Sequence, residues 1–286
     1  MSFSGLFSIG LSGLSAFSAG LEAVSSNIAN SQTTGYKRVR TDFADLIPSD
    51  SPSLGQSVGA GVIGTGVAAV SRQLVGEQGA VTRTNTATNV AVSGEGFFVV
   101  SSDPAGAAPF LFTRAGDFRA DALGNLVNSQ GFYLQGRSAT SLARSGGLQG
   151  LQTVNVNRAP TGIDPATLGA LTGVEIDADG SVIATYASGQ SHTLHRIPLA
   201  LFVNPEGLEE AERTAFRNTT LSGDARLSAA QSGAAGAIEG SALEISTVDV
   251  GQEFSTLIST QRAYSTASRV ISTADELWRT LVETAA

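Results

Sequence analysis

The stretch FSGLFSIGLSGLSAFSAGLEAVSSNIAN, residues 3–30, decides the fold. Its apolar positions recur at alternating spacings of four and three residues, which is the heptad pattern of a helix with one apolar seam. We predict a helix from Ser4 to Asn30, with Asn30 and Gly35 as its stop signals. The positions on this seam are Phe3, Phe7, Gly10, Leu14, Phe17, Leu21, Val24 and Ile28.

The outside of this helix carries almost no charge. Between Met1 and Tyr36 the only charged residue is Glu22, and the other outward positions are Ser, Ala, Gly and Asn. Small uncharged residues suit close packing against protein on several sides, but they are weak helix formers. Two interpretations therefore stay open, a segment that orders only on assembly and an ordinary helix of the chain's own core.

The C-terminal stretch repeats the heptad pattern. Its apolar positions on the heptad grid are Val250, Phe254, Leu257, Tyr264, Ile271, Trp278 and Val282. A second, smaller stripe consists of Ala263, Ala267, Val270, Ala274, Leu277 and Leu281. A helix with two adjacent stripes has more than one neighbour. We predict that the terminal helices pair and that one seam stays free for other copies, a heterologous contact that propagates into a filament or a ring.

The middle of the chain changes to an apolar pattern of period two, which indicates strands. We therefore predict an α+β fold in which paired, coiled-coil-like terminal helices flank a discontinuous all-β domain. The predicted parts are a helical domain over 1–47 and 245–286, a flexible linker over 48–70, a β-rich domain over 71–137 and 172–244, and a short insertion over 138–171.

The composition excludes several functional classes. Charged residues make up 15% of the 286 residues, against about 25% in typical soluble domains. A net charge of −8 argues against a sequence-independent grip on nucleic acid. The chain has no cysteine, which excludes disulfides and thiolate metal sites. The start lacks the basic region of a cleaved signal peptide, and no long uninterrupted apolar run predicts membrane insertion.

Three motifs are similar to known ligand-binding sequences but lack the features that ligand binding requires. Gly59, Gly61 and Gly64 match the spelling of a dinucleotide fingerprint, but no strand–turn–helix context surrounds them. The segment 177–180 resembles the start of a calcium loop and lacks the later glutamate, so we predict a β-turn. His192 and His195 lie three apart on a predicted strand, hence on opposite faces, and we expect them at the surface or rim. We predict no catalytic residue, no cofactor and no metal.

A series of motifs resembles the flagellar rod, hook and hook-associated axial proteins. These motifs are SNIAN (26–30), TGYK (34–37), GEGFF (94–98), FTRAGDF (112–118), GNLV (124–127), GSALE (240–244), VD (248–249) and QRAY (261–264). The family-motif residues singled out here are Asn27, Asn30, Gly35, Tyr36, Gln261 and Arg262. Within the family, NSQG (128–131) with Leu134 and IPLALFVNPEGL (197–208) resemble the hook subunit.

The resemblance implies a hook subunit whose outer domain is reduced to the insertion 138–171. Such a subunit polymerises into a flexible tube that transmits torque from rod to filament. Its implied partners are many copies of itself, rod and hook–filament junction proteins, the hook cap and the type III export apparatus. Its implied place is the extracellular hook, reached without a cleaved signal. The predicted polymerisation seam is Phe7, Leu14, Phe17, Leu21, Val24, Ile28, Phe254, Leu257, Tyr264, Ile271 and Trp278.

Two alternative functions accompany the hook. A distal or proximal rod subunit would be a stiff shaft in the cell envelope, and the compact insertion is compatible with it. A secreted adhesin or binding module is the more remote alternative, and the shortness of the insertion argues against it.

Overall fold

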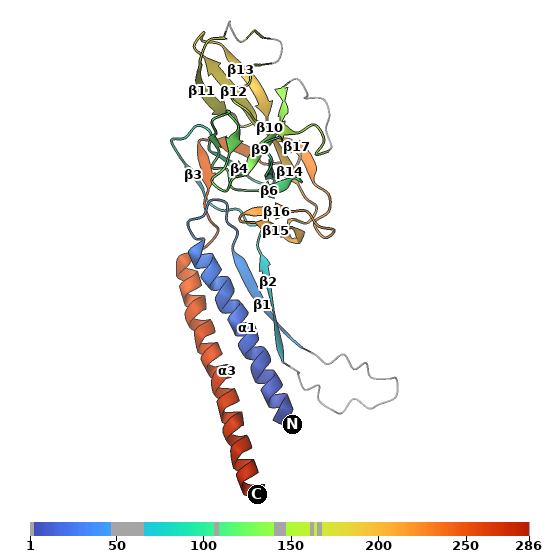
Figure 1. Ribbon diagram of the computed structural model, residues 1–286, viewed down its shortest axis with the longest axis vertical. Helices are drawn as coiled ribbons and strands as arrows, with labels where there is room; N and C mark the ends of the chain where they lie inside the picture. The colour runs from blue at the N-terminus through green and yellow to red at the C-terminus, as the bar shows by residue number, and fades with distance from the viewer. Residues whose placement is uncertain are drawn as a thin grey trace, which may run out of the picture. The chain divides into compact units, whose positions relative to one another are not determined.

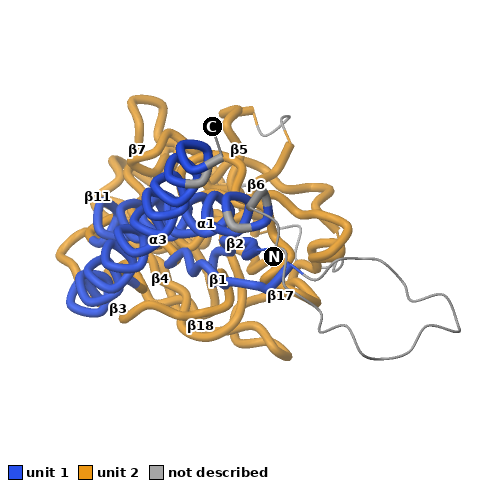
Figure 2. Tube along the Cα trace, turned by 90° about the horizontal axis from the view of Figure 1, so that it is seen from below, with its two compact units in different colours: residues 1–31, 38–74, 248–286 blue, residues 32–37, 75–247 orange. Residues whose placement is uncertain are grey.

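The computed structural model divides the chain into two compact units, coloured separately in Figure 2. Unit 1 consists of residues 1–31, 38–74 and 248–286, and unit 2 consists of residues 32–37 and 75–247. The structure describes residues 3–46, 66–105, 109–139, 147–160, 163–164 and 168–285.

Unit 1 contains two long helices and a hairpin. Helix α1 spans Phe3–Ala29 and helix α3 spans Val250–Ala285. Strands β1 (Val39–Asp45) and β2 (Val67–Gln73) pair in antiparallel register. Helix α1 contacts α3 and both strands of the hairpin, and Figure 1 shows it lying between them.

The start of α3 is fixed by its N-cap residue. Oδ1 of Asp249 accepts hydrogen bonds from the backbone N–H groups of Gly251, at 2.8 Å, and Gln252, at 3.1 Å. These two donors have no partner within the helix, so the carboxylate satisfies them and also complements the helix dipole.

The β1–β2 hairpin of unit 1 includes residues that were predicted to belong to the flexible linker 48–70. Residues 67–70 belong to β2 and pair with β1, in a register that places Phe43 opposite Ala69. The ring of Phe43 lies 5.6 Å from that of Phe17 on α1, and Val67 N–H donates to the Ser12 hydroxyl at 3.2 Å. The linker was predicted from its Gly and Ser content. Composition alone does not show that residues of α1, distant in sequence, contact this segment. Residues 47–65 lie outside the described residues.

The described residues of unit 2 form β-strands and a short 3-10 helix, η2 (Pro205–Gly207). Its strands are β3 (Val81–Arg83), β4 (Val90–Ser93), β5 (Phe97–Ser101), β6 (Leu111–Thr113), β7 (Arg119–Ala120), β8 (Leu126–Val127), β9 (Tyr133–Ser138), β10 (Gln152–Thr153), β11 (Leu171–Ile176), β12 (Ser181–Tyr186), β13 (Ser191–Arg196), β14 (Pro198–Leu201), β15 (Glu209–Glu212), β16 (Ala215–Arg217), β17 (Arg226–Ala229), β18 (Ala237–Gly240) and β19 (Ala242–Glu244).

Most described strands of unit 2 join one sheet with the order β11-β12-β13-β9-β5-β6-β16-β15. Strand β14 pairs with both β5 and β17, while β18 pairs with β4 and β19 pairs with β3. Strand β5 is buried along its whole length. Phe98 and Val100 face one hydrophobic cluster, and Phe97 and Val99 face another, as the two-residue period of a strand requires.

The predicted insertion 138–171 is partly built into this sheet. Strand β10 pairs with β9, and Val154 both donates to the Leu134 carbonyl and accepts from Leu126 N–H, each at 2.9 Å. Val154 and Val156 lie in the main hydrophobic cluster. The segment is rich in Ser and Gly, so its short alternation of apolar residues was not recognised in the sequence. These apolar residues contribute to the core. Residues 140–146, 161–162 and 165–167 lie outside the described residues.

The α+β class is confirmed, with an N-terminal helix, a large β region and a C-terminal helix. The predicted turn at 177–180 is the hairpin connection between β11 and β12. There Gly180 N–H donates to the Asp177 carbonyl at 2.9 Å, and Gly180 has a φ of +82°, a left-handed conformation that favours glycine.

Candidate functional site

Helices α1 and α3 approach each other through small residues. A Cβ atom on Gly10 would lie 2.7 Å from Cγ1 of Ile271, and one on Gly13 would lie 3.9 Å from Cβ of Ala267. The partners' numbers fall along α3 as those on α1 rise, so the helices are antiparallel. The close approach at Gly10 leaves no room for a side chain, which accounts for glycine in an otherwise helical stretch.

The buried face of α1 is displaced around the helix from the predicted seam and is made of smaller residues. It consists of Gly10, Gly13, Ala16, Gly20, Ala23, Val24 and Asn27. The predicted seam lies along its border, with Gly10 and Val24 buried. The other described seam residues of α1 are half-buried, namely Phe7, Leu14, Phe17, Leu21 and Ile28.

On α3 the predicted residues separate into two groups. Ala263, Ala267 and Ala274 of the smaller stripe are buried or half-buried, as are Leu257 and Ile271 of the heptad grid. Exposed to solvent are Phe254, Tyr264 and Trp278 of the predicted seam, together with Val270 and Leu277. The side chain of Leu281 lies outside the described set.

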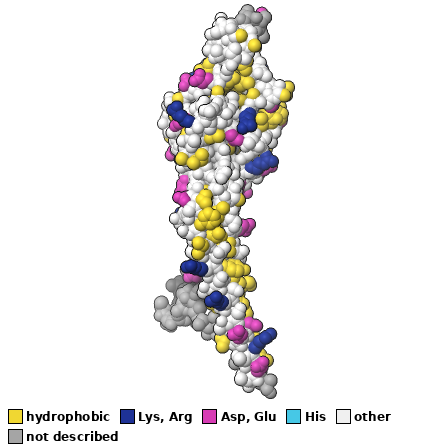
Figure 3. All heavy atoms as spheres, turned by 90° about the vertical axis from the view of Figure 1, so that its left-hand side faces the viewer, with side chains coloured by type: hydrophobic (Ala, Val, Ile, Leu, Met, Phe, Trp, Pro, Cys, Tyr) yellow, Lys and Arg dark blue, Asp and Glu magenta, His cyan; other side chains and the backbone are white. Residues whose placement is uncertain are grey.

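Helix α3 therefore carries a set of large apolar side chains that unit 1 leaves open to solvent. We call it the α3 apolar set. Its members are Val250, Phe254, Ile258, Tyr264, Val270, Leu277, Trp278 and Val282, between 38% and 56% exposed. Val250, Phe254 and Ile258 follow at four-residue intervals and so form one strip. Figure 3 shows apolar side chains open to solvent along the helices. Contiguous exposed apolar surface typically marks an interaction site.

Helix α1 also contains a stretch, Phe7–Ala29, that is long and apolar enough to cross a membrane by length and composition. The sequence-based expectation did not single it out, because Ser and Gly interrupt the apolar residues. One such helix is weak evidence for a membrane span, since helices packed within soluble proteins pass the same test. In the structure α1 contacts α3 and the β1–β2 hairpin.

Unit 2 buries three charged side chains in one network. Lys37 Nζ lies 2.5 Å from Glu244 Oε1, and Arg114 Nη1 lies 3.2 Å from Glu244 Oε2. Backbone N–H of Gly79 donates to Glu244 Oε1 at 2.8 Å. The side chains of Lys37 and Glu244 have no exposed surface, and that of Arg114 has 4%. We call these three residues the buried ion network.

Backbone acceptors complete the network. Lys37 Nζ also donates to the Glu77 carbonyl, and Arg114 Nη2 donates to the Gly94 carbonyl at 2.9 Å. The Arg114 guanidinium lies 5.0 Å from the centre of the Phe97 ring, within cation–π range. Burial lowers the pKa of Lys37, and the Glu244 carboxylate opposes that shift. Although the three charged groups are removed from water, each one therefore has hydrogen-bond partners within the protein, as buried ions require.

The network lies where the chain passes between the two units in sequence. Gly35 N–H donates to the Glu244 carbonyl at 2.9 Å, and Thr247 N–H donates to the Tyr36 carbonyl at 3.1 Å. Gly35 has a φ of +67°, and a Cβ there would lie 2.5 Å from the backbone nitrogen of Ala115. The segment that follows α1 and the segment that precedes α3 are therefore fastened side by side within unit 2.

Three family models of flagellar proteins match this chain. They describe the flagella basal body rod protein (residues 7–37), the flagellar hook protein FlgE/F/G D1 domain (91–184) and the flagellar basal body rod FlgEFG protein C-terminal region (239–284). The flagellar basal-body rod protein FlgG of Caulobacter vibrioides is 34% identical over 274 residues, covering 93% of this chain and 94% of the relative. The chain belongs to the flagellar rod and hook protein family.

Other flagellar rod and hook proteins are similar over nearly the whole chain. The flagellar hook protein FlgE of Brucella suis biovar 1 is 28% identical over 402 aligned positions, which cover 99% of both chains. The rod protein FlgG of Bacillus subtilis is 29% identical over 283 residues, covering 96% of each. The protein is accordingly a structural component of the flagellum.

The buried ion network joins three sequence motifs of the flagellar rod and hook family. Lys37 ends the TGYK motif, Arg114 lies in FTRAGDF, and Glu244 ends GSALE. All three motifs resemble the family, but none of these three residues was predicted as a site residue. The available signal was their charge, because each motif contributes a charged residue in a chain poor in charge.

The other predicted motif residues have separate structural roles. Asn27 is buried, and its side-chain amide exchanges two hydrogen bonds of 2.8 Å with the backbone of Val39, which fastens the last turn of α1 to β1. Asn30 donates to the Ser26 carbonyl at 3.0 Å at the end of the helix. Gln261 and Arg262 are exposed on α3.

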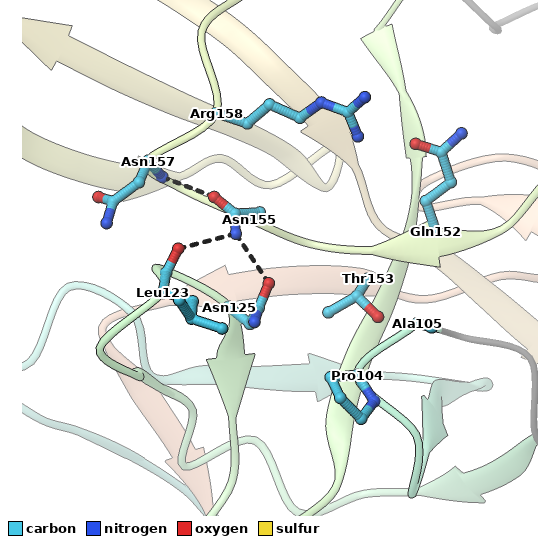
Figure 4. A pocket seen from close by; sticks show the side chains of 9 residues that line it. All are labelled: Pro104, Ala105, Leu123, Asn125, Gln152, Thr153, Asn155, Asn157 and Arg158. Carbon is cyan, nitrogen blue, oxygen red and sulfur yellow. Dashed lines mark hydrogen bonds between the residues drawn. The ribbon is translucent and has the colours of Figure 1, made fainter.

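A polar hollow on unit 2 offers little recognition chemistry (Figure 4). Its central amide, Asn155, donates to the Leu123 carbonyl at 3.0 Å and to Asn125 Oδ1 at 2.7 Å, and it accepts from Asn157 N–H at 2.9 Å. These amide groups are therefore used within the fold. Among the described residues, no cluster of three His, Asp or Glu side chains could hold a metal ion.

The expectation that His195 lies at the surface or rim is wrong, since the residue is 3% exposed. The prediction assumed an uninterrupted two-residue period. Strand β13 instead contains a bulge, because His195 pairs with Val182 while Thr193 pairs with the next residue, Ile183. The extra residue, Leu194, is buried together with His195. His192 keeps partial exposure.

Burial of His195 should make unit 2 less stable in mild acid. Burial first, and the Arg158 charge second, lower the pKa of His195 below its usual 6.5, and Asn155 N–H donates to its Nε2 at 3.4 Å. As pH falls below 6.5, His195 binds a proton in the unfolded chain but stays neutral in the folded chain. The free energy of unfolding therefore decreases. We expect this residue to contribute up to about 1.4 kcal/mol per pH unit to the slope.

The measurement is urea unfolding of unit 2 between pH 7.5 and pH 5. Replacing His195 with Gln should flatten the pH dependence, whereas His192→Gln, the matched control, should leave it unchanged. Equal slopes for His195→Gln and the unaltered protein would contradict the prediction.

Proposed function

We propose that this protein is a subunit of the flagellar hook that polymerises through its terminal helices into a tube. The observation that carries the proposal is the α3 apolar set. Large apolar side chains such as Trp, Phe and Leu do not stabilise a helix on faces that remain in water. In this protein they lie on several sides of α3. Several neighbouring copies can cover them, and their burial would supply the main drive for assembly.

The small-residue contact between α1 and α3 supports the same proposal. Because small residues such as Gly13 and Ala267 lie in the contact within unit 1, Phe254, Tyr264 and Trp278 of the predicted seam keep exposed surface that other copies could cover. We propose that Phe254, Tyr264 and Trp278 make inter-subunit contacts with coiled-coil character. The half-buried seam residues of α1 would border the same contacts.

We prefer the hook over the rod on one ground, that the segments 128–131 and 197–208 resemble the hook subunit. Relatives of both kinds align with nearly all of the chain. The alignment with the Brucella hook protein needs 402 positions, whereas this chain has 286 residues, so that relative carries additional residues that the chain lacks. A tube of such subunits would have a thinner outer layer.

A rod subunit is the second candidate function. The rod protein FlgG of Caulobacter vibrioides matches over 274 residues with similar coverage of both chains, so it has no large extra domain. A hook subunit would lie outside the cell, and a rod subunit in the envelope. In either case we propose export through the flagellar type III apparatus, with rod, junction and cap proteins as partners and no catalytic role.

The test is electron microscopy of the parent bacterium after deletion of its chromosomal copy of this gene. Plasmid-borne expression of the unaltered protein should restore curved tubes outside the cell surface, while cells without it should end at a completed rod. Straight structures confined to the envelope would assign the protein to the rod. Normal hooks in the deletion strain would contradict both assignments.

A further inference from the structure

The chain passes between unit 1 and unit 2 four times. The passages follow residues 31, 37, 74 and 247, and we number them in this order. Because the chain is covalently continuous, any force that one unit exerts on the other is carried through these passages. The contacts that hold the chain next to each passage therefore decide how unit 2 responds to load.

Close to every passage, unit 2 fastens the chain to Glu244. After the first passage, Gly35 N–H donates to the Glu244 carbonyl at 2.9 Å. Lys37, the last residue before the second passage, forms its ion pair with the Glu244 carboxylate. Soon after the third passage, Gly79 N–H donates to Glu244 Oε1 at 2.8 Å. Glu244 itself lies just before the fourth passage, so all four passages are joined at this one residue.

Backbone hydrogen bonds on both sides of Glu244 reinforce this junction. Thr247 N–H donates to the Tyr36 carbonyl at 3.1 Å, and Ile245 N–H donates to the Ala80 carbonyl at 2.9 Å. The segment before the fourth passage is thus bonded to the segment between the first two passages and also to the segment after the third.

Arg114 connects the junction to the main sheet of unit 2. Its Nη1 lies 3.2 Å from Glu244 Oε2, and the residue directly follows β6, which pairs with β5 and β16. A charge-assisted contact is stronger than a neutral hydrogen bond, and burial protects it from screening by salt. Force that arrives at Glu244 therefore spreads into the sheet.

We infer that Glu244 is a load-bearing junction, at which unit 2 takes up force from all four passages together. The inference deepens the proposed function and rests on it for its use in the cell, because a joint that transmits torque loads the chain between its units. Contacts that are loaded together share the force, whereas contacts loaded one after another break in sequence. Lys37 and Arg114 are the positioning residues that hold the Glu244 carboxylate in place.

The test is force-clamp spectroscopy of the full chain in two pulling geometries. In the terminal geometry, tags at both ends apply force to unit 2 along the first and fourth passages, whose chains meet at Glu244. In the internal geometry, handles are attached through Ser129→Cys and Ser188→Cys. Both positions are exposed, and the chain has no other cysteine. Force then runs from β9 through β13 to β12 and does not enter through the passages.

Lys37→Met should shorten the lifetime of unit 2 about tenfold in the terminal geometry, because contacts that break before the transition state contribute fully to the unfolding rate. In the internal geometry the shortening should be roughly threefold smaller, since the junction is then not loaded first. Leu199→Ala is the matched control. Leu199 is fully buried on β14 in the main hydrophobic cluster, so its truncation destabilises unit 2 away from the junction. This control should not shorten the terminal lifetime more than the internal one.

Equal shortening by Lys37→Met in both geometries would overturn the inference. The unaltered protein provides a test that does not depend on the folding of a variant. In the terminal geometry its unit 2 should lengthen in a single step. An earlier small step, in which the end segments detach while the sheet stays folded, would also overturn the inference.

A second experiment examines assembled tubes on cells that swim in a viscous medium, where motor torque is high. Tubes of Lys37→Met should form at normal length in dilute buffer and break in the viscous medium, whereas tubes of Leu199→Ala should persist. Equal breakage of the two variants would show that Glu244 carries no special load in the tube, which overturns the inference. Absence of tubes from the unaltered protein would instead refute the proposed function, and the single-molecule result would still decide whether the junction bears load.

Discussion

Replacing Glu244 with glutamine is expected to lower the free energy of unfolding of unit 2 by about 3–5 kcal/mol. The substitution keeps the shape of the side chain and removes its charge. Lys37 and Arg114 would then be two buried cations without a counter-ion, because the side chain of Lys37 has no exposed surface and that of Arg114 has 4%. Removing one partner of a buried ion pair is costly for this reason, even where the intact pair contributes little.

Urea unfolding, followed by near-ultraviolet circular dichroism of the tyrosines, measures this effect. Tyr36, Tyr133 and Tyr186 lie in unit 2, so the signal reports mainly on that unit. Glu175→Gln is the matched control, since Glu175 is exposed on β11 and has no ion pair among the described residues. The expected change for this control is within about 0.5 kcal/mol. A loss below 1 kcal/mol for Glu244→Gln would contradict the buried ion network.

A double-mutant cycle with Lys37→Met isolates the network from other effects of the substitution. In the Lys37→Met background only one cation depends on Glu244, so Glu244→Gln should cost less than in the unaltered protein. Residues that share a network give coupling energies of about 0.5–3 kcal/mol, whereas independent sites add within about 0.5 kcal/mol. Additive losses would mean that Glu244 acts through Arg114 or the Gly79 backbone alone.

The sequence could not predict this network, because its members are brought together by the tertiary fold. Lys37 and Glu244 are separated by 207 positions, and Arg114 and Glu244 by 130. Local periodicity predicts which face of a strand or helix is buried, and it carries no information on which strands become neighbours. All three residues lie in motifs that resemble the family, but only the β19–β3 pairing and the hydrogen bond from Gly79 N–H to Glu244 show what joins them.

The terminal helices were the most predictable part of the fold. Their heptad pattern gave α1 within a residue at each end, because a long amphipathic helix repeats one signal many times. The pairing face was less predictable. Hydrophobicity ranks Phe17 and Leu21 above Gly10 and Gly13, yet glycine lets two backbones approach so closely that the small residues occupy the contact. Size, rather than hydrophobicity, decides which face meets the neighbouring helix.

Short strands were predicted less well, for a related physical reason. Strand β10 has two residues, and the bulge in β13 shifts its alternation by one. An alternation with a period of two residues can be recognised only when it repeats several times. One extra residue in a strand moves every later side chain to the opposite face of the sheet. His195 and Val154 became core residues through such local irregularities.

Phe254→Asp is expected to abolish polymerisation while leaving the subunit folded. Phe254 is 49% exposed in unit 1, so a charge there meets water in the free subunit and should change its stability by no more than about 0.5 kcal/mol. In the proposed tube the same position would be covered by a neighbouring copy. An unpaired carboxylate would then lose its hydration, at a cost of several kcal/mol at every contact along the polymer.

Sedimentation of polymers from purified protein measures the effect, and swimming motility measures it in cells. The matched control is Gln252→Asp, which places the same charge at an exposed position two residues away, outside the α3 apolar set. Since Gln252 lies in the first turn of α3, a negative charge there is compatible with the helix dipole. Tubes of normal length from Phe254→Asp would show that this part of α3 stays in water after assembly. The drive for polymerisation would then have to come from the distal cluster of Leu277, Trp278 and Val282, where Trp278→Asp becomes the decisive substitution.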